Sequence, residues 1–229
     1  MKTPLIATFG ITLVALGSAL PAAPSALKER GAKEAVQVQT ALSGSGVAAG
    51  ETNLGDLIAD AVRETGHAQV GLVPADEING KAAVAAGKTD PSAIIATLRY
   101  ADDPSDTVVV LNLTGAQLVR VAERSVSRAP QPFDGFLQVS GLQVRYSPSQ
   151  PEGRRVSLVG ADGGEVDAAK TYRVATTRPI AGGSLGYFQI WGQKDIAEDT
   201  GVSIAKSLGA YLDGHKTVNS TVEGRISTR

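Results

Sequence analysis

Apolar residues recur at helical spacing in several segments of the chain. The clearest segment is 53–66, where they follow the i, i+3, i+4, i+7 pattern after a possible cap at Asn53 and before a possible terminator at Gly66. Thr114 and Gln117 have the spacing of a capping box at the start of a later helix. Together the patterns predict four helices, over 53–66, 90–98, 114–128 and 202–212.

Shorter apolar runs, bounded by Gly, Pro, Asp and Ser, predict strands between these helices. Helix and strand alternate in the first half of the chain, whereas strands dominate from Phe136 onward. This order predicts a layered α/β fold, with helices packed on a mixed sheet and a strand-rich second half. The predicted strands cover 35–42, 70–73, 107–113, 136–139, 142–146, 156–159 and 172–176.

The N-terminus has the pattern of a secretory signal peptide. Lys2 precedes an apolar stretch over 5–20, and small residues with prolines follow as far as Ala26. Thr and Gly residues dilute the apolar stretch, which disfavours a permanent membrane helix. We expect a signal peptide over 1–26, a linker over 27–34 and a domain over 35–229. The domain would be exported, to the periplasm or outside the cell, with no membrane contact after cleavage.

Composition and charge exclude several function classes. The chain has 22 basic and 23 acidic residues with no long run of either sign, so it lacks the basic surface that nucleic-acid binding requires. It contains no cysteine, which removes disulfides, thiolate metal ligands and cysteine nucleophiles. Asp102, Asp103 and Asp106 could attract a hard cation, but a solvated acidic turn is the simpler expectation.

Several motifs follow one another in the order of a known family. The most specific is the strand pair over 136–144 with the turn that follows it at 151–156. The others are the helix segment at 51–61, Leu-Thr-Gly at 113–115, the strand at 170–176, the glycine pair at 182–183 and Glu-Gly-Arg-Ile at 223–226. This series spans 35–226 and resembles the C-terminal, substrate-binding domain of 5'-nucleotidases.

The resemblance implies a domain that holds the nucleoside part of a substrate against a metallophosphoesterase domain with two metal ions. This chain lacks the motifs of that second domain, since His67 and His215 are its only histidines. The resemblance therefore implies the nucleotide- or nucleoside-binding half of a nucleotide-hydrolysing system in nucleotide catabolism, not catalytic alone. No catalytic residue, metal ligand or cofactor is expected in this chain. Divalent metals are expected only in a separate metallophosphoesterase chain.

The same resemblance implies a site for the phosphate of the ligand. In the family a Gly-Gly-Ile-Arg motif supplies an arginine that contacts this phosphate. The matching stretch here contains Asn79 and ends at Lys81. Lysine offers a point charge in place of the bidentate fork of arginine, so the contact would be weaker and less directional. Alternatively, Lys81 could be an ordinary solvated surface lysine.

The family also stacks the base between two aromatic rings. Counting back from Leu113 puts Val108 at the place of the first ring, which would mean that this ring is lost. The second ring follows the glycine pair Gly182 and Gly183. It would be Tyr187, or Phe188 if the loop is shifted by one residue. Packing in the core or in the loop is the alternative role for both rings.

Two other function classes remain open at this stage. Residues 182–186 satisfy the G-x-S-x-G pattern, so Ser184 could be the nucleophile of a serine esterase, with Asp195 or Asp199 and then His215. Pro179 argues against this interpretation, because it interrupts the strand that should lead into the serine. The other class is a stand-alone binding or structural module with no role in hydrolysis.

Overall fold

A five-stranded mixed sheet lies at the centre of residues 34–229, which with residue 1 form the part of the chain that the computed structural model describes. In sheet order the strands are β11 (Ile196–Ser203), β6 (Thr107–Thr114), β10 (Thr171–Thr177), β3 (Val70–Pro74) and β7 (Leu137–Ser140). β10 and β3 run parallel, and every other neighbouring pair of this sheet is antiparallel. The predicted signal peptide and nearly all of the predicted linker lie outside the described residues.

Helices and smaller sheets surround the central sheet. The α-helices are α1 (Asn53–Thr65), α2 (Pro91–Ile95), α3 (Gly115–Ser125), α4 (Arg178–Ala181) and α5 (Ile204–Gly214). One small sheet joins β13 (Ile226–Thr228), β8 (Leu142–Tyr146) and β9 (Val156–Gly160). The others join β12 (Thr217–Val218), β1 (Val36–Val38) and β5 (Gly87–Thr89), and β2 (Leu42–Ser43) with β4 (Ala83–Val84).

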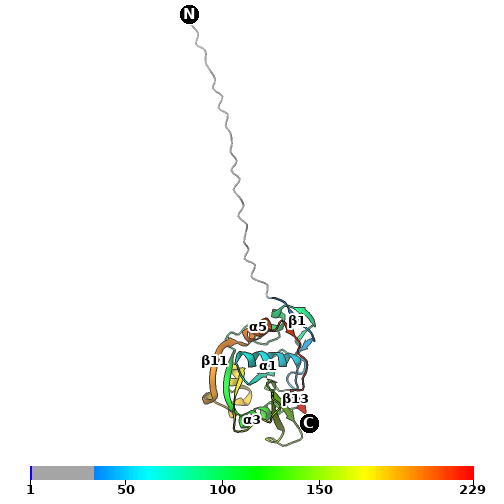
Figure 1. The fold of residues 1–229 in the computed structure, drawn as a ribbon, viewed down its shortest axis with the longest axis vertical. Helices are drawn as coiled ribbons and strands as arrows, with labels where there is room; N and C mark the ends of the chain where they lie inside the picture. The colour runs from blue at the N-terminus through cyan, green and yellow to red at the C-terminus, as the bar shows by residue number, and fades with distance from the viewer. Residues whose placement is uncertain (2–33) are drawn as a thin grey trace. The chain divides into compact units, whose positions relative to one another are not determined.

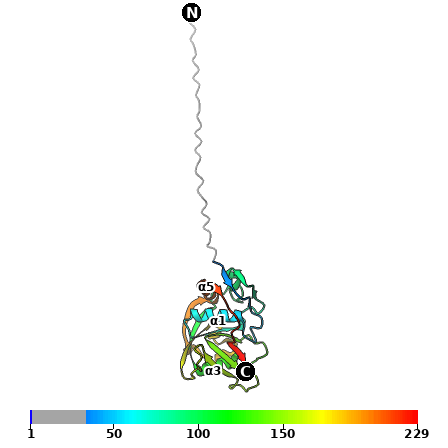
Figure 2. The ribbon, with the colours of Figure 1, turned by 45° about the vertical axis from the view of Figure 1, so that its right-hand side comes forward.

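The two faces of the central sheet contribute to different hydrophobic cores. Val108 of β6 and Ala175 of β10 face a core that they share with α1 and α5. Their neighbours Val109 and Val174 face the opposite core, which they share with α3 and the sheet of β8 and β9. Alternate residues of a strand point to opposite faces, so the sheet separates the two cores. Figures 1 and 2 both show α1 between α5 and α3.

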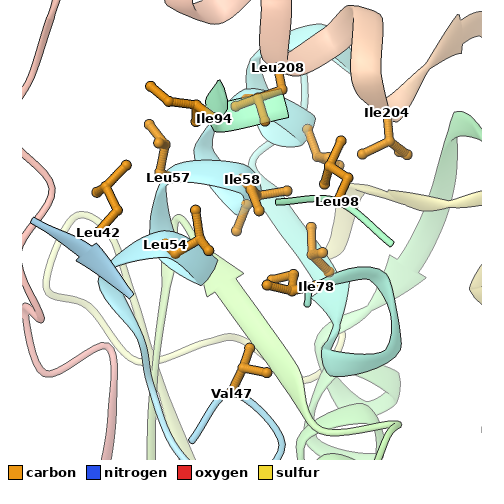
Figure 3. Close-up of a cluster of buried hydrophobic side chains, with 14 of the residues drawn as sticks. Leu42, Val47, Leu54, Leu57, Ile58, Ile78, Ile94, Leu98, Ile204 and Leu208 are labelled. Carbon is orange, nitrogen blue, oxygen red and sulfur yellow. The ribbon is translucent and has the colours of Figure 1, made fainter. Parts of the chain in front are cut away.

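Side chains from three helices meet on the α1 side of the sheet. Leu57 and Ile58 of α1 pack in one cluster with Ile94 of α2 and Leu208 of α5 (Figure 3). All four are almost completely buried. Burial of a side chain of this size contributes roughly 1.5–3 kcal/mol. The cluster therefore fixes α2, and with it the segment that follows α2 at the edge of the sheet.

The mixed α/β fold predicted from the sequence is confirmed, as are the predicted starts of α2 and α3. Thr114 Oγ1 accepts a hydrogen bond from the Gln117 backbone N–H at 3.2 Å, and Gln117 Oε1 accepts one from the Thr114 N–H at 2.9 Å. This is the predicted capping box of α3. Asp90 likewise caps α2, because its Oδ1 accepts a hydrogen bond from the Ser92 N–H at 2.8 Å.

Several element boundaries differ from the prediction. The expected strand over 35–42 is two strands, β1 and β2, which belong to different sheets. Thr52, not Asn53, caps α1, because Thr52 Oγ1 accepts a hydrogen bond from the Gly55 N–H at 3.0 Å. Helices α2 and α3 end at Ile95 and Ser125, before the predicted 98 and 128. Strand β11 was missed, because its sequence IAEDTGVS is largely polar and exposed.

The sequence pattern predicted Gly66 as the residue that ends α1, but His67 has this role. His67 adopts the left-handed conformation that ends the helix, with φ of 44°, whereas Gly66 stays helical with φ of −77°. Gly66 is required for another reason. A Cβ on it would approach the Cβ of Ala175 in β10 to 2.6 Å, so glycine allows α1 to pack closely on the sheet.

Candidate functional site

The carboxyl ends of the parallel strands β3 and β10 meet at one edge of the central sheet, here called the carboxyl edge. β3 continues into the short 3-10 helix η1 (Ala75–Glu77), and β10 continues into α4. β6 begins at the same edge, because Val108 pairs with Thr177. Ligands of open α/β sheets bind in the crevice outside the carboxyl ends of the strands. The loops at this edge therefore form the candidate site.

The first wall of the site consists of residues 79–81 and 98–100. Asn79, Lys81 and Arg99 line an open depression of about 560 Å³. The Asn79 backbone N–H donates to the Thr97 carbonyl at 2.9 Å, which joins the two segments, and Asn79 Oδ1 accepts from the Lys81 N–H at 3.0 Å. Lys81 is exposed and takes part in no ion pair within residues 34–229. Its charge is available to a ligand.

An aromatic ring that the sequence analysis missed lies on this wall. Tyr100 is 41% exposed, and its hydroxyl donates to Asp76 Oδ2 at 3.0 Å. Val108, which counting had put at the place of the first ring, is fully buried inside β6. Val108 therefore offers no ring to a ligand, whereas Tyr100, shortly after α2, is an exposed ring on this wall. Arg99 beside it was missed as well, and its only ion pair within residues 34–229 is a 4.0 Å contact with Asp76.

The second wall consists of residues 182–188, after α4. Gly183 has a φ of 93°, and a Cβ on it would come within 2.6 Å of the Phe188 Cβ. The Gly183 carbonyl also accepts a hydrogen bond from the Phe188 N–H at 3.0 Å. Glycine at 183 therefore lets the loop close on itself and present Phe188, whose side chain is 66% exposed. Gly182 lies exposed beside it.

Tyr187 points the other way, into the core. It is 0% exposed, its hydroxyl donates to the Gly135 carbonyl at 2.7 Å, and its ring stacks on Trp191 at 5.2 Å. Burial raises the pKa of Tyr187 well above its ordinary value. A ring in this position has no face free for a ligand. Of the two residues proposed for the second ring, the structure exposes only Phe188.

Charged groups lie beneath both walls. The Arg178 Nε donates to the Ser105 carbonyl at 2.9 Å, and its guanidinium pairs with Asp199. Asp106 is buried, so it is not part of the solvated acidic turn expected at 102–106. Glu77 of η1 is buried as well, and burial, followed by its contact with Asp106, raises the pKa of Glu77 to about 10.

Ser184 lacks the surroundings of an esterase nucleophile. A nucleophile elbow places the serine directly between a strand and a helix. Here α4 separates β10 from Ser184, and the residues after Ser184 form an irregular 3-10 turn with left-handed Leu185 and Gly186. The proposed partners are engaged elsewhere within the described chain, because Asp199 pairs with Arg178, and His215 contacts Glu64 at 3.2 Å and stacks on Tyr211.

The described part of the chain lacks two features that would change the kind of site. Residue 1 and residues 34–229 contain no group of three or more His, Asp or Glu side chains arranged to hold a metal ion. Within the same residues no helix has the length and apolar character needed to cross a membrane.

Comparison with protein families gives the class of this fold and site. The model of the 5'-nucleotidase C-terminal domain matches residues 32–192. The chain belongs to the 5'-nucleotidase C-terminal domain family. This finding confirms the resemblance inferred from the motifs, and the matched residues include both walls of the candidate site.

The relatives are longer proteins that contain this domain. The chain is 27% identical over 187 residues to a trifunctional nucleotide phosphoesterase from Bacillus subtilis, covering 77% of this chain and 12% of the relative. It is 29% identical over 198 residues to a snake venom 5'-nucleotidase from Naja atra, covering 77% of this chain and 36% of that protein. The chain therefore spans little more than a third of these relatives at most.

Solved structures agree with the domain assignment. The 5'-nucleotidase precursor of Thermus thermophilus superposes with a TM-score of 0.74 at 29% identity, over 86% of this chain and 39% of that one. An NAD nucleotidase from Haemophilus influenzae gives a TM-score of 0.72 over 88% of this chain and 39% of its own. Its identity is only 16%, so this second match speaks for the fold alone.

Proposed function

We propose that this domain binds a nucleotide or nucleoside at the carboxyl edge, as the binding half of a nucleotide-hydrolysing system. The observation that carries the proposal is the pairing of chemistries at one sheet edge. An exposed ring, Phe188, lies on one wall, and two cations with little internal pairing, Lys81 and Arg99, lie on the other. A base and a phosphate are the ligand parts that suit these groups. Membership of the 5'-nucleotidase C-terminal domain family supports the same ligand class.

Different residues would bind the base and the phosphate of the ligand. Phe188 would stack on the base, and such stacking contributes about 1–3 kcal/mol per base. Tyr100 offers a second exposed ring, although its hydroxyl is held by Asp76. Lys81 and Arg99 would attract the phosphate, Arg99 with a planar fork and Lys81 with a point charge. Asn79 would act indirectly, because its side chain fixes the Lys81 backbone.

Hydrolysis in this proposal belongs to a separately encoded metallophosphoesterase chain. That chain would carry the divalent metals and dock over the carboxyl edge, as the relatives' greater length allows for an additional domain. Cleavage of the segment 1–26 as a signal peptide, and action in the periplasm or outside the cell, form part of the same proposal. Alone, the chain would bind its ligand without releasing phosphate.

Calorimetric titration of the mature chain with AMP, UMP and adenosine tests the binding role. We expect Phe188→Ala to weaken binding by about 1–3 kcal/mol, roughly 5- to 150-fold, for the nucleotides and for adenosine alike. Val222→Ala is the matched control, because Val222 is also an exposed apolar side chain but lies near the C-terminus.

Two results would overturn this function. The first is the absence of heat with millimolar ligand, together with a failure of an added metallophosphoesterase to restore either binding or turnover. The second is an equal loss of affinity in Phe188→Ala and Val222→Ala, which would remove the stacking contact from the site. Either result would favour a structural or protein-binding module.

A further inference from the structure

Two buried acidic side chains lie beneath the candidate site and make none of its proposed ligand contacts. Glu77, the last residue of η1, is 2% exposed, and Asp106, just before β6, is 5% exposed. Within residues 34–229, Glu77 Oε1 and both side-chain oxygens of Asp106 have no hydrogen bond of ordinary geometry. Buried oxygens without a partner are rare in folded proteins, so the arrangement needs an explanation.

The explanation is that the two carboxyl groups face each other within hydrogen-bonding reach. Two carboxylates buried side by side would repel each other, so such a pair keeps a proton. Burial first, and then the contact with Asp106, hold the pKa of Glu77 near 10. Burial also raises the pKa of Asp106, but the hydrogen bond with Glu77 acts in the opposite direction. One proton is therefore shared between the two carboxyl groups.

Glu77 and Asp106 each belong to a segment that is connected to one wall of the site. On the first side, the Glu77 carbonyl accepts a hydrogen bond from the Arg99 N–H at 2.8 Å, and η1 leads directly into Asn79. On the second side, Asp106 faces Arg178 at the start of α4, whose Nε donates to the neighbouring Ser105 carbonyl. A bond between Glu77 and Asp106 therefore connects the turn after β3 to the loop before β6 and to α4.

We propose that Glu77 and Asp106 are positioning residues of the ligand site, and that a shared proton between their carboxyl groups fixes the first wall relative to the second. The inference rests on the proposed function for its consequence, since only a ligand that touches both walls needs their spacing fixed. Asp76 and Arg99 face Glu77, and Asp103 and Arg178 face Asp106. The cations Arg99 and Arg178 thus lie on opposite sides of the pair.

The shared proton makes the stability of the fold depend on pH. The folded chain holds a proton on Glu77 up to about pH 10, whereas an unfolded chain releases it near the ordinary value of 4.5. The unfolded state therefore gains stability relative to the folded state as pH rises between these values. Glu77→Gln keeps a donor toward Asp106 and has nothing to titrate, so its melting temperature should fall less from pH 5 to pH 9.

Two measurements on the ligand-free chain test the pair directly. At pH 8, wild type should show an infrared band of a protonated carboxyl group that is absent from Glu77→Gln, so the difference spectrum of these two proteins should contain this band. The control variant Glu123→Gln should keep the band. Glu123 is the matched control, because it is a buried glutamate that accepts hydrogen bonds from the Arg155 and Val156 amides, on the α3 side. Absence of the band in the Glu77→Gln difference spectrum would overturn the shared proton.

Hydrogen exchange tests the positioning role. Glu77→Ala should speed exchange of the Arg99 and Phe188 amides at least tenfold while the α3 amides keep their rates, and Glu77→Gln should restore slow exchange. If wild type binds AMP, Glu77→Ala should also lower the affinity for AMP at least tenfold, and Glu77→Gln should lower it less than threefold. Unchanged exchange at Phe188 in Glu77→Ala would overturn the coupling of the walls. Failure of wild type to bind AMP would instead remove the proposed function, and exchange would still decide the coupling.

Discussion

Cations at two corners of this domain are held in different ways. At the C-terminal corner, defined by residues 223–228 and α1, Arg225 donates two hydrogen bonds to Asp60, at 2.8 and 3.0 Å, and a third to the Val139 carbonyl at 3.0 Å. At the carboxyl edge, Lys81 has no ion pair within the described residues, and Arg99 has a 4.0 Å contact with Asp76 and a long hydrogen bond of 3.5 Å to the Ile78 carbonyl. Arg225 thus finds strong partners within the chain, whereas the charges of Lys81 and Arg99 remain accessible to a ligand.

The C-terminal corner also accounts for one of the family motifs. The Glu51 carboxylate accepts backbone hydrogen bonds from Glu223, Gly224 and Ile226 at 2.7, 3.0 and 2.8 Å. Burial works against the charged form of Arg225, but the hydrogen bonds and charge of Asp60 raise the pKa of Arg225. The Glu-Gly-Arg-Ile segment thus fastens β13 to the start of α1. These contacts indicate a role in stability.

Loss of Arg225 should have a large effect on folding. Arg225→Ala leaves the Asp60 carboxylate without its cation and also removes the guanidinium that lies 3.8 Å from the fully buried Asp56. Removing one partner of a buried ion pair costs about 3–5 kcal/mol. We expect a loss of that size in urea unfolding, compared with less than about 0.5 kcal/mol for the exposed Arg154→Ala. A loss below about 1 kcal/mol, the typical cost of an ordinary substitution, would contradict the structural role of this corner.

The neighbours Tyr187 and Phe188 allow a residue that stabilises the fold to be compared with one that is exposed to a ligand. Tyr187→Ala removes a fully buried ring and its hydrogen bond to Gly135, so it should destabilise the fold by about 3–5 kcal/mol. Phe188→Ala removes an exposed ring and should change stability by no more than about 0.5 kcal/mol. Thermal or urea unfolding measures both. Equal losses would mean that Phe188 is also a core residue and not a ligand contact.

The buried acid at the C-terminal corner predicts a pH effect that can be separated from that of Glu77. Burial raises the pKa of Asp56 to about 9, although the charge of Arg225 opposes the shift. The folded state thus keeps a proton that the unfolded state loses near 3.8, and stability falls as pH rises toward 9, by up to about 1.4 kcal/mol per pH unit. Asp56→Asn should reduce this slope without changing AMP binding. An unchanged slope would show that Asp56 is ionised in the folded chain.

Ser184 should show the smallest effect of all. Its loop has no nucleophile elbow, and His215 contacts Glu64 instead. We expect no labelling of the chain by a fluorophosphonate probe and no hydrolysis of p-nitrophenyl acetate. Labelling that disappears in Ser184→Ala but persists in Thr176→Ala would make the serine esterase the better account.

The sequence predicted what depends on local periodicity and capping. The helix over 53–66 and the capping box at Thr114 were predictable because their patterns are strong and their buried faces are continuous. Strand β11 was not, because its position at the end of the sheet leaves most of its residues polar and exposed. Asp106 was expected in solvent for a similar reason. Its contact with Glu77 joins residues far apart in the sequence, and no local pattern indicates it.

The candidate site was only partly predictable, because it depends on which strands are neighbours. Spacing along the chain gives no indication that β10 lies beside β3, although this pairing brings the loops after both strands to one edge. The choice between Tyr187 and Phe188 depended on which ring packs on Trp191 and Gly135 in the core, and these contacts are tertiary. Tyr100 could have been found from its place shortly after the apolar run of α2.

The central claim is that Lys81 and Arg99 at the carboxyl edge, which have few partners within the described residues, serve a phosphate. The most direct test is calorimetric titration of wild type, Lys81→Ala and the control Lys216→Ala with AMP and with adenosine. Lys216 is matched in charge but pairs with Glu34 at 3.3 Å. We expect Lys81→Ala to weaken AMP binding by about fivefold or more and adenosine binding by less than about twofold, with no change in Lys216→Ala. Equal losses for AMP and adenosine in Lys81→Ala would contradict the account.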